Sequence, residues 1–118
     1  MLPPTSVDDL ARTHEGLGII YDAMGDLDRA LIHYYESVRY AEALDDLYLA
    51  GNNRFNLALA LLKEHRFTDA LEYAHAALRN YETFGDRATE KIQNTRSFIE
   101  TVEQQIEWVE QLLKDEGD

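Results

Sequence analysis

The sequence predicts an all-α fold, a right-handed stack of two helix-turn-helix hairpins closed by a long C-terminal capping helix. Three observations predict this fold. The 118 residues include only six glycines and two prolines, so few positions interrupt a helix. The chain matches itself when it is shifted by 40 residues, and its last third carries apolar residues at alternating intervals of three and four. At this length we expect one domain over residues 1–118.

The first hairpin is predicted over residues 6–45. Its first helix begins near Ser6, because Pro4 cannot continue a helix backwards and a serine can cap the exposed amide groups. The pair Gly25-Asp26 is typical of the end of a helix. Apolar residues at helical spacing then predict a second helix from about Asp28 to Leu44.

The second hairpin is predicted over residues 46–85. Apolar residues at helical spacing predict its first helix from about Leu47 to Glu64. Thr68 is placed to cap the next helix, which reaches Phe84 and ends at Gly85.

The 40-residue shift places one hairpin on the other. Leu17-Gly18 falls on Leu57-Ala58, and Ala30 falls on Ala70, so small residues match small ones. Small side chains let two helices approach closely, and we expect Gly18 to face Ala30 and Ala58 to face Ala70. A single hairpin cannot bury its apolar face alone, so the two copies are predicted to stack.

The last segment, residues 86–116, is predicted to be one long helix with Asp86 as its cap. A strict 40-residue shift would turn Ser97 inward, whereas a register two residues shorter turns Ile99 inward and is physically better. The first half is expected to close the stack, and the part beyond Val102 reaches roughly 18 Å further at 1.5 Å per residue. The apolar seam of this helix consists of Ala88, Ile92, Thr95, Ile99, Val102, Ile106, Val109 and Leu113.

Leaving the end of this seam in water would expose an unusual apolar stripe. Either the helix bends over its own module, or it pairs with another chain, or it packs on parts of a longer protein. Because basic residues come early in this helix and acidic ones late, we expect two paired copies to be antiparallel. The predicted interface between copies consists of Val102, Ile106, Trp108, Val109 and Leu113.

The chain is strongly acidic, with 11 Lys and Arg against 23 Asp and Glu and a formal net charge of −12. Such a field repels nucleic acid and anionic lipid, so we expect neither as a partner and favour an apolar or basic protein segment. There is no cysteine, which removes disulfides and thiolate chemistry. No apolar run approaches the ~20 residues that span a bilayer, and residues 1–4 lack the pattern of a signal peptide. We therefore expect a cytoplasmic protein.

The sequence contains no constellation typical of an active site. Its four histidines, His14, His33, His65 and His75, are scattered over the predicted helices and form no His-Glu-x-x-His motif. The glycines at positions 16 and 18 lie inside a predicted helix and follow no strand, so they form no phosphate loop. We expect no enzymatic activity, no metal and no cofactor.

The first hairpin carries a more specific pattern. The pair Leu17-Gly18 is followed by Tyr21, by a turn at Gly25, and then by Ala30 and Tyr34. This pattern resembles the signature of tetratricopeptide repeats. The 40-residue period is similar to the extended repeats of kinesin light chains and of bacterial signalling regulators.

The resemblance covers about residues 6–85 and has two departures. His65 stands where the second copy would carry its turn glycine, and Glu42 and Glu82 stand where a proline usually separates the repeats. The Lys and Asn that hold a peptide carboxylate in the chaperone-tail binders of this family are replaced here by Glu15 and Ile19, which argues against a carboxylate clamp.

The resemblance implies a protein-protein interaction module whose groove takes a peptide or a helix. Two alternatives are a homo-oligomerisation domain built on the C-terminal helix and a peptide-sensing regulatory domain of a larger signalling protein. The groove lining that the resemblance implies consists of Arg12, Glu15, Ile19, Asp22, Asn52, Phe55, Leu59, Leu62 and Lys63.

Overall fold

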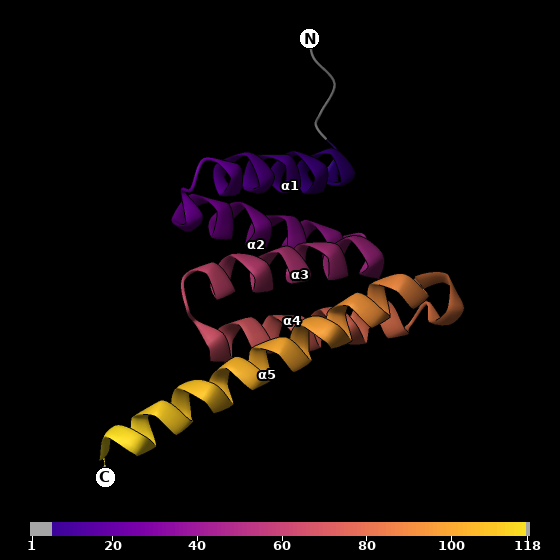
Figure 1. The fold of residues 1–118 in the computed structure, drawn as a ribbon. Coiled ribbons are helices and arrows are strands. Elements are labelled where there is room, and N and C mark those ends of the chain that lie inside the picture. The colour runs from indigo at the N-terminus through magenta and orange to yellow at the C-terminus, as the bar shows by residue number, and fades with distance from the viewer. Residues whose placement is uncertain (1–5, 118) are drawn as a thin grey trace.

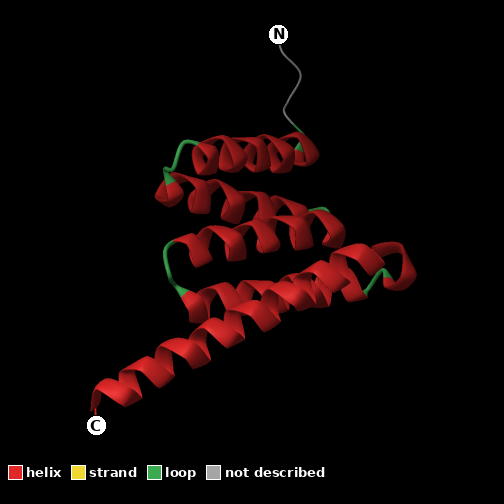
Figure 2. Ribbon diagram, in the orientation of Figure 1, coloured by secondary structure: helices red, strands yellow, loops and turns green. Residues whose placement is uncertain are grey.

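The structure, a computed structural model, describes residues 6–117 and is helical almost throughout that range (Figure 2). The prolines at positions 3 and 4, which were predicted to precede the first helix, lie outside the described residues. The elements are α1 (Val7–Ala23), α2 (Leu27–Ala43), α3 (Leu47–Lys63), α4 (Phe67–Glu82), a 3-10 helix η1 (Gly85–Ala88) and α5 (Thr89–Gly117).

The first four helices lie one above the next as two antiparallel hairpins, and α5 runs back across α4 (Figure 1). Beyond the start of α4, α5 continues as an unbroken helix away from the stack. The described residues span 69 × 35 × 19 Å, and the projecting end of α5 accounts for the long dimension. The predicted all-α fold of two hairpins and a long C-terminal helix is confirmed.

The three turns within the stack share one geometry at 20-residue intervals. Gly25, Asp45 and His65 all adopt the left-handed conformation, with φ values of 81°, 56° and 60°. In each turn the amide of the following residue donates a hydrogen bond to a carbonyl five residues back, over 2.9–3.0 Å. This closure satisfies carbonyls at the helix end, and it explains why all three turns have the same length.

The residue after each left-handed position is the N-cap of the next helix. Asp26 and Asp46 accept hydrogen bonds from amides three residues on, at 3.2 and 3.0 Å, as Ser6 does at the start of α1. These side chains satisfy amide groups that the first helical turn leaves unpaired.

Two predicted caps are wrong. The cap of α4 is Arg66, whose side chain makes no capping bond, and Thr68 lies inside the helix. The shared turn geometry places the start of α4 here whatever side chain occupies the capping position. Asp86 does not cap α5 either, because it lies within the 3-10 helix that separates α4 from α5.

The first hairpin closes around Gly18 and Tyr34. The side chain nearest to Gly18 is Tyr34 rather than the predicted Ala30, and a β-carbon at Gly18 would lie 2.6 Å from the tyrosine ring. In the second hairpin Ala58 shares a buried cluster with Ala74. The same helix crossing is therefore filled by a glycine and a tyrosine in the first hairpin and by two alanines in the second.

The first half of α5 closes the open face of α4 in the predicted register. Thr95, Ile99 and Val102 are buried, whereas Ser97 and Thr101 are exposed. Ile99 packs in the cluster of the second hairpin, so this half of the helix completes the core.

Candidate functional site

The polar residues predicted to line a groove mostly hold the helices together. On the face shared by α1 and α3, Lys63 Nζ lies 2.6 Å from Asp22 Oδ1. Between the same two helices, Asn53 Nδ2 donates to Glu15 Oε2 over 3.1 Å. Asp22 also accepts a 3.4 Å hydrogen bond from the hydroxyl of Tyr34. The charges of the predicted groove are thus largely paired within the chain.

Three further predicted groove residues have partners of their own. Arg12 pairs with Asp8 one turn earlier in α1, at 3.2 Å. Asn52 accepts a 2.6 Å hydrogen bond from the hydroxyl of Tyr81. Phe55 is half-buried and meets Phe98 of α5 edge-on, with ring centroids 5.4 Å apart, so it is not a free groove side chain.

Apolar side chains remain available at one end of this face. Ile19 of α1 is 52% exposed, and Leu59 and Leu62 of α3 are half-buried. Leu62 lines a hollow of about 350 Å³ together with Trp108 of α5. The structure therefore brings a residue from the predicted groove and one from the predicted interface between copies onto the same hollow.

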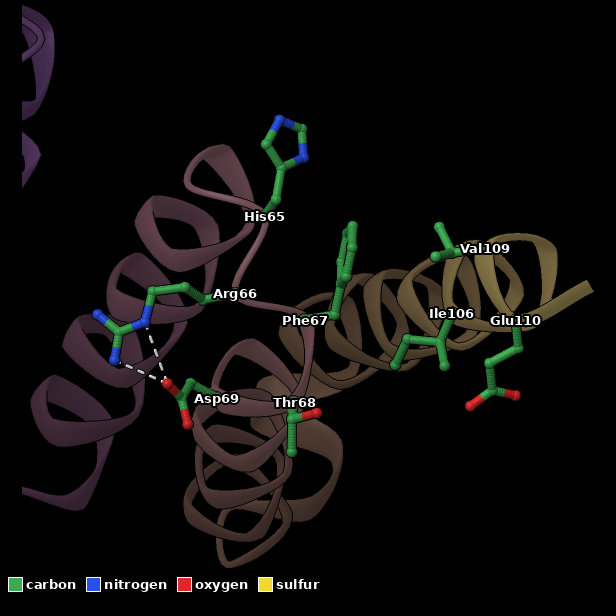
Figure 3. A pocket seen from close by; sticks show the side chains of 8 residues that line it. All are labelled: His65, Arg66, Phe67, Thr68, Asp69, Ile106, Val109 and Glu110. Carbon is green, nitrogen blue, oxygen red and sulfur yellow. Dashed lines mark hydrogen bonds and ion pairs between the residues drawn. The ribbon is translucent and has the colours of Figure 1, made fainter. Parts of the chain in front are cut away.

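A second hollow of about 360 Å³ also borders Phe67, and we call the two together the terminal cleft. Both hollows are lined by His65, Phe67 and Val109, and Ile106 lines the second. Figure 3 shows Phe67 projecting from the start of α4 beside Ile106 and Val109 of α5. Arg66 pairs with Asp69 at 2.7 Å, and both side chains line this second hollow, so its wall is partly apolar and partly charged.

The apolar seam of α5 leaves the core at Val102. That residue is completely buried within its own chain, so its predicted place in an interface between copies is wrong. The following seam residues, Ile106 and Val109, are half-buried, and Leu113 is 63% exposed. Trp108, at 66% exposed, broadens the apolar surface toward the α3 side, because it lines the same hollow as Leu62.

Acidic side chains border this apolar surface. From residue 100 onwards α5 carries six acidic side chains against one basic side chain, Lys114. Val102 and Val109 stand at position d of the heptad, so Glu103 and Glu110 stand at position e, along one edge of the seam. Glu100 and Glu107 stand at position b, further round the helix. The acidic residues are Glu100, Glu103, Glu107, Glu110, Asp115 and Glu116, all exposed.

Two histidines that the sequence analysis treated as scattered come together in the first hairpin. Nδ1 of His14 lies 3.0 Å from Nδ1 of His33 across α1 and α2, so one nitrogen donates and the other accepts. Their rings stack on each other and continue onto Tyr40 and Tyr21. The pair joins two helices, and within residues 6–117 no group of three metal-ligating side chains forms.

Two buried tyrosines act as neutral hydrogen-bond donors. Burial raises the pKa of Tyr34 to about 12, and the nearby carboxylate of Asp22 adds to the shift. Burial also raises the pKa of Tyr81, whose hydroxyl donates to Asn52. Both groups therefore serve to hold helices together at neutral pH.

In the part of the chain that the structure describes, no helix combines the length and the apolar character needed to cross a bilayer. Comparison of the chain with protein-family models, with curated proteins and with solved structures finds no match.

Proposed function

We propose that the chain is a protein-binding module whose contact surface is the terminal cleft together with the exposed apolar side of α5. The observation that carries this proposal is the exposure of Trp108, which lines one of the two hollows, and of Leu112 and Leu113 further along α5. Large aromatic and aliphatic groups next to preformed pockets are typical of sites that hold a partner's anchor residues.

The proposal keeps the helical-repeat interpretation but places the binding surface at the terminal cleft and not in the groove that the resemblance implies. The repeated turn geometry supports the resemblance to tetratricopeptide repeats. However, charged residues of the implied groove are taken up by internal pairs such as Asp22 with Lys63, at the C-terminal ends of α1 and α3. Exposed apolar groups of α5 lie where that helix faces the α3–α4 turn, so a ligand finds apolar contact area at that end.

The alternative of a homodimer through α5 meets a charge problem. Pairing the projecting halves antiparallel sets Glu103 and Glu110 of one copy beside the same residues of the other. Pairing over the whole helix requires the first half of the seam, including Ile99, and that half is already buried against α4. A partner of different sequence avoids both difficulties.

A selection from a phage-displayed library of random peptides tests the proposal. Peptides enriched on the parent chain are expected to bind Trp108→Ala or Leu113→Ala at least about tenfold more weakly, since each removes a large exposed contact worth about 1.4 kcal/mol or more. Arg79→Ala, an exposed change on α4, serves as the control. Peptides that bind all three variants as well as the parent, or the absence of any enrichment, would refute the proposal.

A further inference from the structure

We infer that the partner held by the terminal cleft is a basic amphipathic helix that lies along the projecting half of α5. This inference rests on the proposed function and adds the form and the charge of the ligand. Three observations carry it: the spacing of the apolar side chains, the position of the acidic ones, and the shape of the cleft.

The apolar side chains of α5 are spaced for another helix. Ile106, Val109 and Leu113 follow one another at intervals of three and four, which is the spacing into which a second helix inserts its own side chains. An extended peptide places its side chains alternately on two faces, so only every second residue could reach this stripe. Its backbone groups would also find no strand edge to pair with among the described residues.

The charges select a basic helix. Glu103 and Glu110 lie at the edge of the seam, where facing helices in a coiled coil place side chains of opposite charge. Neither carboxylate has an ion-pair partner among the described residues. Lysine or arginine on the edge of the incoming helix would meet them, whereas an acidic helix, including a second copy of α5, would be repelled.

The cleft supplies the fixed point for this helix. Phe67 and Val109 border both hollows. A large apolar side chain of the partner entering either hollow would contact α4 and α5 at once, which anchors one end of the helix at the stack. The remainder then follows α5 outward past Leu113, over roughly 20 Å for a contact of about 14 residues.

Synthetic peptides of about 18 residues test the inference, because they cover the projecting half as a helix of roughly 27 Å. The first peptide carries leucines at positions a and d of each heptad and lysines elsewhere. The second carries glutamates in place of the lysines. The third has the same composition as the first, in an order that forms no apolar stripe. Trp108 is the single tryptophan, so its emission reports binding at this surface directly. We expect the basic amphipathic peptide to shift the emission to shorter wavelength and to bind at least about tenfold more tightly than either control peptide.

Matched variants separate a specific site from general attraction to an acidic chain. Replacing Glu103 and Glu110 by Gln is expected to weaken the basic peptide several-fold and to reduce its dependence on salt. Replacing Glu100 and Glu107 by Gln removes the same charge from positions off the seam and is expected to have a smaller effect. Equal losses in the two double variants, or equal binding of the peptide without a stripe, would overturn the inference.

The outcomes distinguish the inference from the proposed function. If library peptides depend on Trp108 but the basic amphipathic peptide does not bind, the ligand is not such a helix and the binding module stands. If neither the library peptides nor the basic peptide depends on Trp108, the proposed function and the inference are both refuted. Light scattering tests whether a second copy of the chain occupies this surface. A dimer in the parent protein that becomes a monomer in the Ile106→Glu, Val109→Glu double variant would assign the surface to a second copy and overturn the inference.

Discussion

At the scale of single residues, the two hairpins solve one packing problem with different pairs. Gly18 leaves room for the ring of Tyr34, and the second hairpin places Ala58 near Ala74 at the equivalent crossing. Because interiors are close-packed, the side chains that meet at each crossing must fit one another, and Ile99 of α5 joins the two alanines in the second hairpin. The pair, and not either residue alone, is therefore the unit that the fold requires.

A double-mutant cycle tests this pairing. Gly18→Ala alone is expected to destabilise the protein by about 1–3 kcal/mol, because its β-carbon overlaps the Tyr34 ring. In a Tyr34→Ala background the same change should be neutral or stabilising by up to about 1 kcal/mol, since alanine favours a helix more than glycine does. Urea unfolding of the four proteins gives the coupling, and additive changes would show that the two residues do not share one space.

His65 occupies a position that suits glycine. Its φ of 60° is one that side chains rarely adopt, and Gly25 holds the same place in the first hairpin. His65→Gly should therefore stabilise the fold by roughly 1 kcal/mol. His75→Gly, at an exposed position inside α4, should destabilise it by about the same amount. Thermal melts that move in the same direction for both variants would contradict this account.

At the scale of the element, α5 is one helix with two different surroundings. Its first half buries Ile99 and Val102 against the stack, whereas its second half projects with Leu113 largely in water. A helix of this length gains most of its stability from tertiary packing, so the two halves should differ in stability although the secondary structure is continuous.

Substitutions along the seam of α5 measure this difference. Val102→Ala should destabilise the protein by about 1–3 kcal/mol, because it opens a cavity in a fully buried site. Leu113→Ala should change stability by no more than about 0.5 kcal/mol, because that side chain is exposed in the free protein. Hydrogen exchange should likewise be faster for amides after residue 109 than around Ile99. Equal costs for the two substitutions would mean that the projecting half is packed in solution.

At the scale of the whole molecule, burial of tyrosines links folding to alkaline pH. An unfolded tyrosine ionises near pH 10, whereas the pKa of Tyr34 in the folded protein is about 12 and that of Tyr81 is also raised. Their contribution is therefore fully present below about pH 10 and is lost as the pH rises through the folded pKa values. The protein should unfold progressively more easily above pH 10.

Phenylalanine variants test this linkage by urea unfolding from pH 8 to 11. Tyr34→Phe should lower stability at pH 8 by about 0.5–1.5 kcal/mol, because Asp22 loses a hydrogen bond. Its stability should then fall less steeply above pH 10 than that of the parent. Tyr35→Phe, at an exposed position, should keep the parent's slope. A Tyr34→Phe profile as steep as the parent's would assign the alkaline loss to other groups.

Local chemistry determined much of this protein from its sequence. Helix ends follow from capping groups and turn residues, so predicted bounds such as Leu47 to Glu64 lie within a residue of α3. The register of α5 follows from its apolar period, which turned Ile99 inward as predicted. The start of α4 was missed because the turn geometry, and not a capping side chain, sets it.

Contacts between distant residues were decided only by the tertiary structure. Helical period shows which side chains share a face, but the crossing of two helices selects the one that each meets, as with Tyr34 over Gly18. The same holds for the facing nitrogens of His14 and His33, which lie 19 residues apart. The apolar seam of α5 is continuous in sequence, and where it passes from core to surface depends on where the stack ends, at the α3–α4 turn and the start of α4. That ending buries Val102 and leaves Trp108 beside an open hollow, so the position of the candidate site is a property of the assembled stack.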